Sequence, residues 1–263
     1  MLSKPALSLL IPFYNERDNL AALLNSVVAI KWEWPIELIF VDDCSQDDSW
    51  EILQSWLITH ANDLSQKRVT VGQVRHTINQ GKGVAIQRAI TLSTGTVLIV
   101  QDADSEYLPS EIPILVNPIL EGRADVVFGS RFRQSGAQAH RTYHYFGNKL
   151  LTFLSNIASG LHLTDMETCY KTFHRDILAN INLRSRRFGF EPEVTAHVAR
   201  LKIIVWELPI SYYPRGYSEG KKITWKDGVA AIWHIIYFNW ICSSKERFLP
   251  GIPKKYLLKK IRG

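Results

Sequence analysis

Two aspartates separated by one residue follow an apolar segment in the first half of the chain. Asp102 and Asp104 come just after Val97–Val100, a run typical of a buried strand. Carboxylates placed this way can hold a divalent cation, and hard oxygen ligands suit Mn²⁺ or Mg²⁺. Glu106 is a candidate third ligand. A surface turn that uses aspartates as caps would give the same spacing.

A glycine-rich turn, residues 79–83 (NQGKG), precedes a predicted helix. Such a turn at a helix N-terminus can bind phosphate, although an ordinary turn remains an alternative. It is not a P-loop, because His76 and Gly83 stand where that motif needs glycine and Ser or Thr. The third glycine of a dinucleotide fingerprint is also missing, which argues against kinase-type and dinucleotide-type sites.

These residues sit at the ends of predicted strands. Strand-like segments alternate with helical ones, which predicts an α/β fold with a mostly parallel sheet and helices on both faces. The expected strands are 6–11, 36–41, 69–74, 96–100, 125–128 and 203–208; the expected helices are 20–28, 52–57, 83–92, 112–120, 147–159, 188–201 and 227–241. Polar clusters follow four of the strands, and the carboxyl ends of parallel strands form ligand sites. We expect these clusters to converge on one edge.

Two local features complete the expected organisation. Asn15 is a plausible N-cap for the first helix, and residues 164–174 are expected to be polar and irregular. Residues 1–225 are expected to form the catalytic domain, followed by an amphipathic helix and a basic tail in residues 226–263. The tryptophans and tyrosine of that helix suit a membrane surface, as does the basic tail, but the slightly favoured alternative is that the helix packs on the domain. Residues 146–154 are a second candidate contact.

The composition is that of a globular chain. Of its 263 residues, 46% are hydrophobic and 21% charged, with a net charge of +6, so general disorder is excluded. Three scattered cysteines favour neither a disulfide framework nor a zinc site, and reduced thiols favour the cytoplasm. No apolar run reaches the roughly 20 residues of a spanning helix, and no leader segment is expected.

Eight segments in order resemble family-2 glycosyltransferases of the GT-A type (nucleotide-diphospho-sugar transferase) fold. They resemble most closely the branch of dolichol- or polyprenyl-phosphate mannose (hexose) synthases. The segments run from Leu9 to Ile223 and read LLIPFYNE, IFVDDCSQDDS, NQGKGVAIQRAI, VLIVQDADSEY, ADVVFGSRF, LTDMETCYKTF, RFGFEPEVTA and LPISYYPRGYSEGKKI. The resemblance implies an inverting, metal-dependent enzyme that moves a hexose from a UDP- or GDP-sugar to a polyprenyl or dolichyl phosphate.

The resemblance also implies roles for individual residues. The nucleotide-sugar is expected at Pro12, Tyr14, Glu16, Asp43, Lys82, Asp102 and Ala103. The metal is expected at Asp102, Asp104 and Glu106. Catalytic roles are expected for Asp104, Arg131, Asp165, Glu167, Arg215 and Lys222, of which the basic residues would stabilise the diphosphate.

The need for a general base depends on the acceptor. A hydroxyl needs a carboxylate to take its proton, whereas a phosphate monoester is largely a dianion at pH 7 and can attack without one. Asp165 and Glu167 are the carboxylates expected near the acceptor. Glu191 and Glu193 are further candidates, or acids favoured in the first turn of a helix.

Three rival functions remain open from the sequence. One is sugar transfer to a glycan or lipid hydroxyl in surface polysaccharide assembly. Another is a non-catalytic protein that binds nucleotide-sugars. The third, nucleic-acid binding, is disfavoured because the aromatic residues do not alternate with a basic stripe. The preferred hypothesis is an enzyme in the cytoplasm, peripheral on the membrane, with no nucleic-acid partner.

Overall fold

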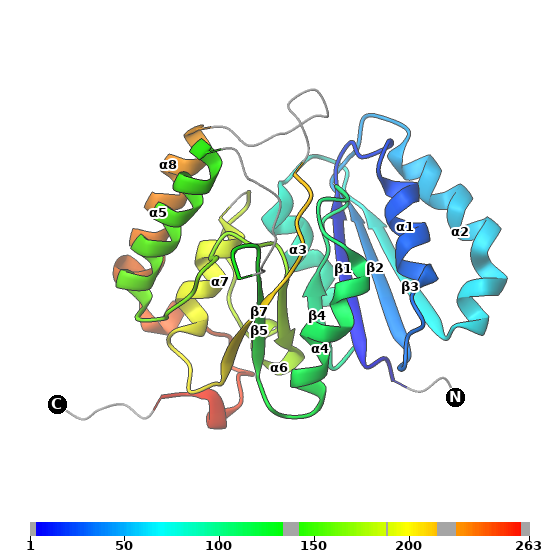
Figure 1. The fold of residues 1–263 in the computed structure, drawn as a ribbon. Coiled ribbons are helices and arrows are strands. Elements are labelled where there is room, and N and C mark those ends of the chain that lie inside the picture. Colours follow the sequence, from blue (N-terminus) through cyan, green and yellow to red (C-terminus); the bar gives the residue numbers. More distant parts are fainter. Residues whose placement is uncertain (1–3, 134–141, 188, 215–224, 259–263) are drawn as a thin grey trace.

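The computed structural model describes residues 4–133, 142–187, 189–214 and 225–258. Their centre is a seven-stranded sheet of order β3-β2-β1-β4-β6-β5-β7, in which only β6 runs antiparallel to its neighbours (Figure 1). The strands are β1 (Leu7–Phe13), β2 (Ile36–Asp42), β3 (Val69–Arg75), β4 (Val97–Val100), β5 (Val126–Ser130), β6 (Lys171–His174) and β7 (Val205–Pro209). The predicted α/β fold with a mostly parallel sheet is confirmed.

Helices connect the strands and lie on both faces of the sheet (Figure 1). The helices are α1 (Leu20–Ala29), α2 (Ser49–Gln66), α3 (Lys82–Leu92), α4 (Ile112–Leu120), α5 (Thr142–Ser159), α6 (Arg175–Leu178), α7 (Phe190–Val198) and α8 (Trp225–Ile236). Three short 3₁₀ helices are η1 (Pro109–Glu111), η4 (Ser244–Glu246) and η5 (Lys254–Tyr256), and η3 (Tyr237–Ile241) is a π-helix that continues α8. Because α2 begins at Ser49 and ends at Gln66, it is much longer than the helix expected at 52–57.

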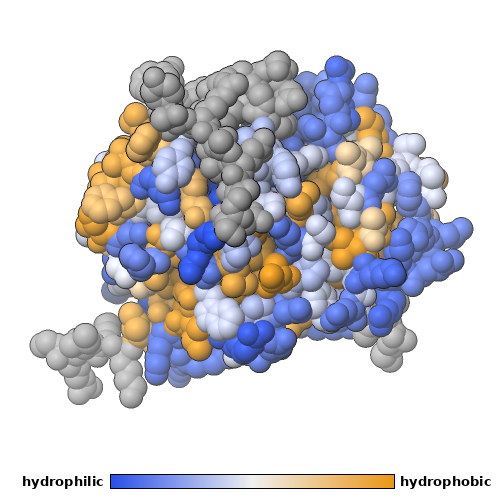
Figure 2. All heavy atoms as spheres, viewed as in Figure 1, coloured by the Kyte–Doolittle hydropathy of each residue, from blue (hydrophilic) through white to orange (hydrophobic). Residues whose placement is uncertain are grey.

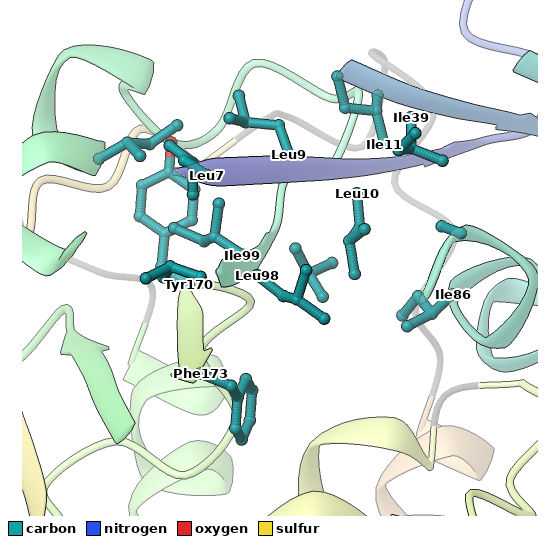
Figure 3. Close-up of a cluster of buried hydrophobic side chains, with 14 of the residues drawn as sticks. Leu7, Leu9, Leu10, Ile11, Ile39, Ile86, Leu98, Ile99, Tyr170 and Phe173 are labelled. Carbon is teal, nitrogen blue, oxygen red and sulfur yellow. The ribbon is translucent and has the colours of Figure 1, made fainter. Parts of the chain in front are cut away.

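The core is built on the central strands. Every residue of β1 and β2 is buried, since helices cover both faces of these strands. Leu9 of β1 lies opposite Ile99 of β4, and Leu10 lies near Leu98 (Figure 3). Burial of each such side chain stabilises the fold by roughly 1.5–3 kcal/mol. The rigid strands therefore fix where their carboxyl ends lie.

The strand register aligns the predicted polar clusters. Phe13 of β1 lies opposite Asp42 of β2, and Leu10 lies opposite Val100 of β4. The residues that follow each strand consequently leave the sheet at the same edge. We call this the catalytic edge.

The expectation of irregular structure for residues 164–174 holds for 164–170, which belong to no helix or strand, but is wrong for 171–174, which form β6 between β4 and β5. Lys171 and Thr172 of β6 are fully buried. Because these residues are polar, the sequence pattern did not indicate a central strand here. The expected N-cap of α1 is also wrong: Asn19 holds that position, while Asn15 has a positive φ of 52°. The Asn15 side chain accepts a hydrogen bond from the Gln46 amide instead (2.7 Å).

A second helical layer stands beside the β7 edge of the sheet. Helices α5 and α8 pack against each other and against α7 (Figure 1). Ala158 of α5, Ile235 of α8 and Met166 of an intervening loop form a small buried cluster between them. Among the described residues, no helix is both long enough and apolar enough to cross a bilayer.

The close approach of α3 to the 184–187 loop makes a stability prediction. A Cβ on Gly83 would lie 2.0 Å from the Ser185 carbonyl oxygen, so Gly83→Ala should lower the free energy of unfolding by about 1–3 kcal/mol. Gly147→Ala in α5 is the matched control, because a Cβ there meets nothing within 4 Å and should stabilise the helix by about 0.5–1 kcal/mol. Urea denaturation of both variants measures the difference. Equal effects of the two substitutions would contradict the packing described.

Candidate active site

Lys82 joins two carboxylates at the catalytic edge. Its Nζ lies 2.9 Å from Asp102 Oδ2 and 3.1 Å from Glu191 Oε1. Burial opposes the charged form of Lys82, but the Asp102 and Glu191 carboxylates outweigh it and hold the Lys82 pKa well above its ordinary value. This ammonium group therefore stays charged, and it draws α3, the end of β4 and α7 together.

Asp104 lies two residues after Asp102 and is partly exposed. Its Oδ1 accepts a hydrogen bond from the Glu106 amide (3.2 Å), and Ser105 between them has a positive φ of 58°. Ala103 is buried beneath this turn. A hydrogen bond within the turn therefore holds Asp104 close to the end of β4.

Glu106 connects the turn after β4 with the segment after β7. Its Oε2 accepts a hydrogen bond from the Tyr212 hydroxyl (2.9 Å), and its carbonyl accepts one from the Tyr213 amide (2.9 Å). Burial, with the Glu106 carboxylate second, raises the Tyr212 pKa, so the phenol remains a hydrogen-bond donor.

The described residues contain no group of three His, Cys, Asp or Glu side chains arranged to hold a metal ion. Asp102 and Asp104 nevertheless supply hard oxygen donors on one turn. Such a set fits Mn²⁺ or Mg²⁺ where phosphate oxygens and water complete the shell. Asp102, which also pairs with Lys82, and Asp104 are the two candidate ligands on this turn.

Asp43 anchors the glycine-rich loop. Its carboxylate accepts hydrogen bonds from the amides of Gln80 (2.9 Å) and Gly81 (2.6 Å), and its Oδ1 lies 2.8 Å from His76 Nδ1. Gly81 has a positive φ of 95°, and a Cβ there would lie 2.3 Å from the Arg186 carbonyl oxygen. Asp43 therefore places Lys82 beside Asp102, a role that its spacing in the sequence did not indicate.

The residues predicted after β1 surround the same edge. Pro12 is buried within the strand, and Tyr14 follows it with partial exposure. Glu16 is nearly buried; its Oε2 accepts a hydrogen bond from Asn19 Nδ2 (2.9 Å), and its amide donates to Ser49 Oγ (2.8 Å). Arg215 and Lys222 lie outside the described residues.

Arg131 and Asp165 form a buried bidentate ion pair. Nε and Nη2 of Arg131 each lie 2.7 Å from a different oxygen of Asp165, and the Arg131 amide donates to the same carboxylate (3.0 Å). Burial alone would raise the Asp165 pKa, but Arg131 holds it below its ordinary value. Asp165 is therefore a poor proton acceptor at neutral pH, and loss of either partner would cost about 3–5 kcal/mol.

Glu207 of β7 holds the loop that carries Asp165, and sequence reasoning missed it. Its carboxylate accepts hydrogen bonds from the amides of Thr164 (2.8 Å) and Asp165 (3.0 Å) and from the Thr164 hydroxyl (2.8 Å). It also pairs with Arg133 at 3.3 Å. The available signal was a lone acid in an otherwise apolar strand segment.

Glu167 has the most perturbed carboxyl group at this edge. Burial, reinforced by the negative charge of Glu191, raises the Glu167 pKa to about 7. Within the described part of the chain, its buried Oε1 has no hydrogen-bond partner. Nearby, burial lowers the pKa of Lys171 to about 8, and Lys171 Nζ donates to the Met166 carbonyl (2.6 Å).

Glu191 and Glu193 both stand in the first turn of α7 but act differently. Glu191 pairs with Lys82, whereas Glu193 is fully buried and accepts hydrogen bonds from the amides of Arg184 (2.7 Å) and Ser185 (2.9 Å). Glu193 thus fixes the 184–187 loop against α3. The same loop presents the exposed residues Arg186 and Arg187 near Gly81, a cationic pair that the sequence analysis did not single out.

The fold and the polar edge agree with a comparison to known families. The model of "Glycosyl transferase family 2" matches residues 8–181, which span β1 to the end of α6 and include the Asp102–Asp104 turn. The chain therefore belongs to glycosyl transferase family 2, and the predicted resemblance is confirmed.

Curated relatives have names consistent with this membership. The chain is 28% identical over 222 residues to an undecaprenyl-phosphate mannosyltransferase of Micrococcus luteus, covering 81% of this chain and 85% of the relative. It is 29% identical over 216 residues to an undecaprenyl-phosphate 4-deoxy-4-formamido-L-arabinose transferase of Aeromonas hydrophila, covering 81% of this chain. The match spans 62% of the length of that relative.

Solved structures show the same fold. Glucosyl-3-phosphoglycerate synthase from Mycobacterium tuberculosis, in complex with Mn²⁺, uridine-diphosphate and phosphoglyceric acid, aligns with a TM-score of 0.65 at 18% identity. The alignment covers 91% of this chain and 80% of the synthase. The expected GT-A type fold is thereby confirmed.

The raised Glu167 pKa makes a prediction about stability. Its folded-state pKa, about 7, exceeds the ordinary 4.5, so the folded protein binds more protons than the unfolded chain between these values. Stability should therefore fall as pH rises through this window. Glu167→Gln removes this effect, so the variant should gain stability relative to the parent between about pH 5 and pH 8. Urea denaturation across this range checks it, and a pH-independent difference would contradict it.

Proposed function

We propose that this protein is an inverting, metal-dependent glycosyltransferase that moves a hexose from a nucleoside-diphosphate sugar to a polyprenyl or dolichyl phosphate. Asp102 and Asp104 at the end of β4, with the Arg131–Asp165 pair across β6, are the single arrangement that carries this proposal. The names of the curated relatives support the acceptor class. The proposed donor nucleotide is UDP or GDP.

The donor binds along the ends of β1, β2 and β4. Pro12, Tyr14 and Glu16 contact the nucleoside, and Asp43 holds the glycine-rich loop beside it. Asp102 and Asp104, with Glu106 close by, would hold the divalent ion Mn²⁺ or Mg²⁺. The ion, when bound, stabilises the negative charge that grows on the leaving diphosphate. Arg215 and Lys222, of the late basic segment, are proposed to contact that diphosphate as well.

The acceptor reaches C1 of the sugar from the opposite side. A phosphate monoester is largely a dianion at neutral pH, so its oxygen attacks without transferring a proton. Asp165 is not needed as a base in this reaction, and its ion pair with Arg131 makes it unsuited to that role. Its proposed role is to orient Arg131, whose guanidinium also lies 5.0 Å from the Tyr212 ring centroid. Because a polyprenyl phosphate is held in a bilayer, the proposed location is the cytoplasmic face of the membrane.

A second candidate function is transfer to a hydroxyl group of a glycan or lipid. The observation in its favour is Glu167, whose pKa of about 7 suits a general base. The two functions differ in what they require of this carboxyl group.

Asp104→Asn should reduce transfer at least about 100-fold, because it removes a charged oxygen donor at the developing diphosphate. The assay follows release of UDP or GDP in the presence of Mn²⁺. Asp176→Asn in α6 is the control, since its side chain is 52% exposed and outside this edge. A thermal-shift series with UDP- and GDP-sugars shows whether the donor still binds. Full turnover by Asp104→Asn would rule out the metal assignment.

Glu167→Gln distinguishes the two acceptor classes. If the acceptor is a phosphate, the variant should keep kcat within about tenfold of the parent. If the acceptor is a hydroxyl, loss of the base should reduce kcat by roughly 10²–10⁴-fold. Assays with a polyprenyl phosphate and with a sugar-hydroxyl acceptor, each over pH 5.5–8.5, separate these outcomes.

A further inference from the structure

Helices α5 and α8 expose an apolar surface that the rest of the described chain does not cover. We call it the apolar platform. Figure 2 shows hydrophobic side chains gathered over these two helices. The platform consists of Tyr145, Phe146, Leu150, Phe153 and Ile157 on α5, with Val229, Trp233 and Ile236 on α8 and Trp240 and Ile241 on η3. Contiguous apolar surface of this kind marks an interaction site.

The spacing shows that the platform is a second apolar stripe on each helix. Ala158 of α5 and Ala231 and Ile235 of α8 face inward and are buried. Phe153 and Trp233 belong to the outer stripes and are 60% and 56% exposed. Packing on the domain therefore accounts for one face of each helix and leaves the other without a partner among the described residues.

Three cationic side chains, Lys149, Arg184 and Lys245, border the platform together with the acids Asp227 and Glu246; we call the three cations the cationic rim. Within the described residues 145–159 and 227–241, Lys149 and Asp227 are the only charged side chains, and neither is fully exposed. Lys149 Nζ lies 4.2 Å from the Phe132 ring centroid, and Arg184 donates to the Tyr237 hydroxyl (3.3 Å). Lys245 beyond the end of η3 is exposed, and the one acid beside it, Glu246, pairs with Arg184.

The platform is connected directly to the proposed acceptor loop. Met166 packs against Ala158 and Ile235, and its amide donates to Thr152 Oγ1 (3.0 Å). Lys149 Nζ donates to the Thr164 carbonyl (3.2 Å). The loop that carries Asp165 and Glu167 is thus fixed to the inner side of the same two helices.

The basic tail lies elsewhere. Tyr256 is buried, its carbonyl accepts a hydrogen bond from the Lys202 amide (2.7 Å), and Leu257 bridges to Leu201. These contacts precede β7, at the end of the sheet away from the catalytic edge. Lys254 and Lys255 of η5 are therefore poor candidates for the contact beside the site.

We propose that the apolar platform inserts into the interfacial layer of a lipid bilayer and so seats the acceptor loop at the membrane surface. This inference rests on the proposed lipid-phosphate acceptor. Tryptophan and tyrosine side chains, an apolar stripe on helices and a cationic rim are the features of interfacial binding to anionic lipid. A twofold contact between two copies is disfavoured, since it would bring the cationic rims together.

The experiment uses the full chain and vesicles of phosphatidylcholine and phosphatidylglycerol. Phe153→Ser/Trp233→Ser should bind these vesicles at least tenfold more weakly than the parent in sedimentation. Ile58→Ser/Ile114→Ser is the matched control, because these residues of α2 and α4 are 79% and 52% exposed and lie outside the platform. Its binding should equal that of the parent.

Activity separates this inference from the proposed function. With a short-chain, water-soluble polyprenyl phosphate, Phe153→Ser/Trp233→Ser should retain parental turnover, whereas turnover of a vesicle-borne acceptor should fall at least tenfold. If the parent binds vesicles but transfers sugar to neither acceptor, the inference about the apolar platform stands and the proposed function is overturned. Absence of vesicle binding by the parent, or equal binding by both variants, would overturn the platform. Light scattering provides a further check: if the parent is a dimer and the platform substitutions dissociate it, the membrane inference is also overturned.

Discussion

The contact of Lys82 with Asp102 and Glu191 is the interaction on which the catalytic edge depends. The Asp102 and Glu191 carboxylates come from distant parts of the chain and would repel each other. The ammonium group of Lys82 lies between them and offsets that repulsion. Lys82 reaches this position because Asp43 binds the amides before it and because Glu193 holds the loop that packs on α3. Each of these acids thus stabilises the placement of another residue at the edge.

A second ion cluster stands across β6 and organises the other side of the edge. Glu207 binds the amides of the acceptor loop, and Asp165 of that loop binds Arg131 at the end of β5. Between the two clusters lie Glu167 and Lys171, whose pKa values move toward neutrality because burial outweighs the opposite charges near them. The ion pairs therefore shape the edge, and Glu167 and Lys171 keep protonation states that can change near pH 7.

Local sequence patterns predicted those features of the fold that depend on residues close together in the sequence. Apolar runs gave six of the strands, and the acids that follow them marked the edge at which they converge. The contacts that define the site are long-range: Lys82 and Glu191 are 109 residues apart, and Arg131 and Asp165 are 34 apart. No spacing rule connects such pairs. Strand β6 escaped prediction for the same reason, since Lys171 and Thr172 are polar residues whose burial depends on both flanking strands.

Tyr212 has a consequence for how ligands on the two sides of the edge affect each other. Its hydroxyl binds Glu106 beside the Asp102–Asp104 turn, while its ring lies over the Arg131 guanidinium. A ligand that shifts Glu106 must therefore change the surroundings of Arg131 as well. Thermodynamic linkage requires this effect to be mutual, so the occupant of either side alters the affinity of the other by the same factor. One aromatic side chain thus connects the two halves of the edge.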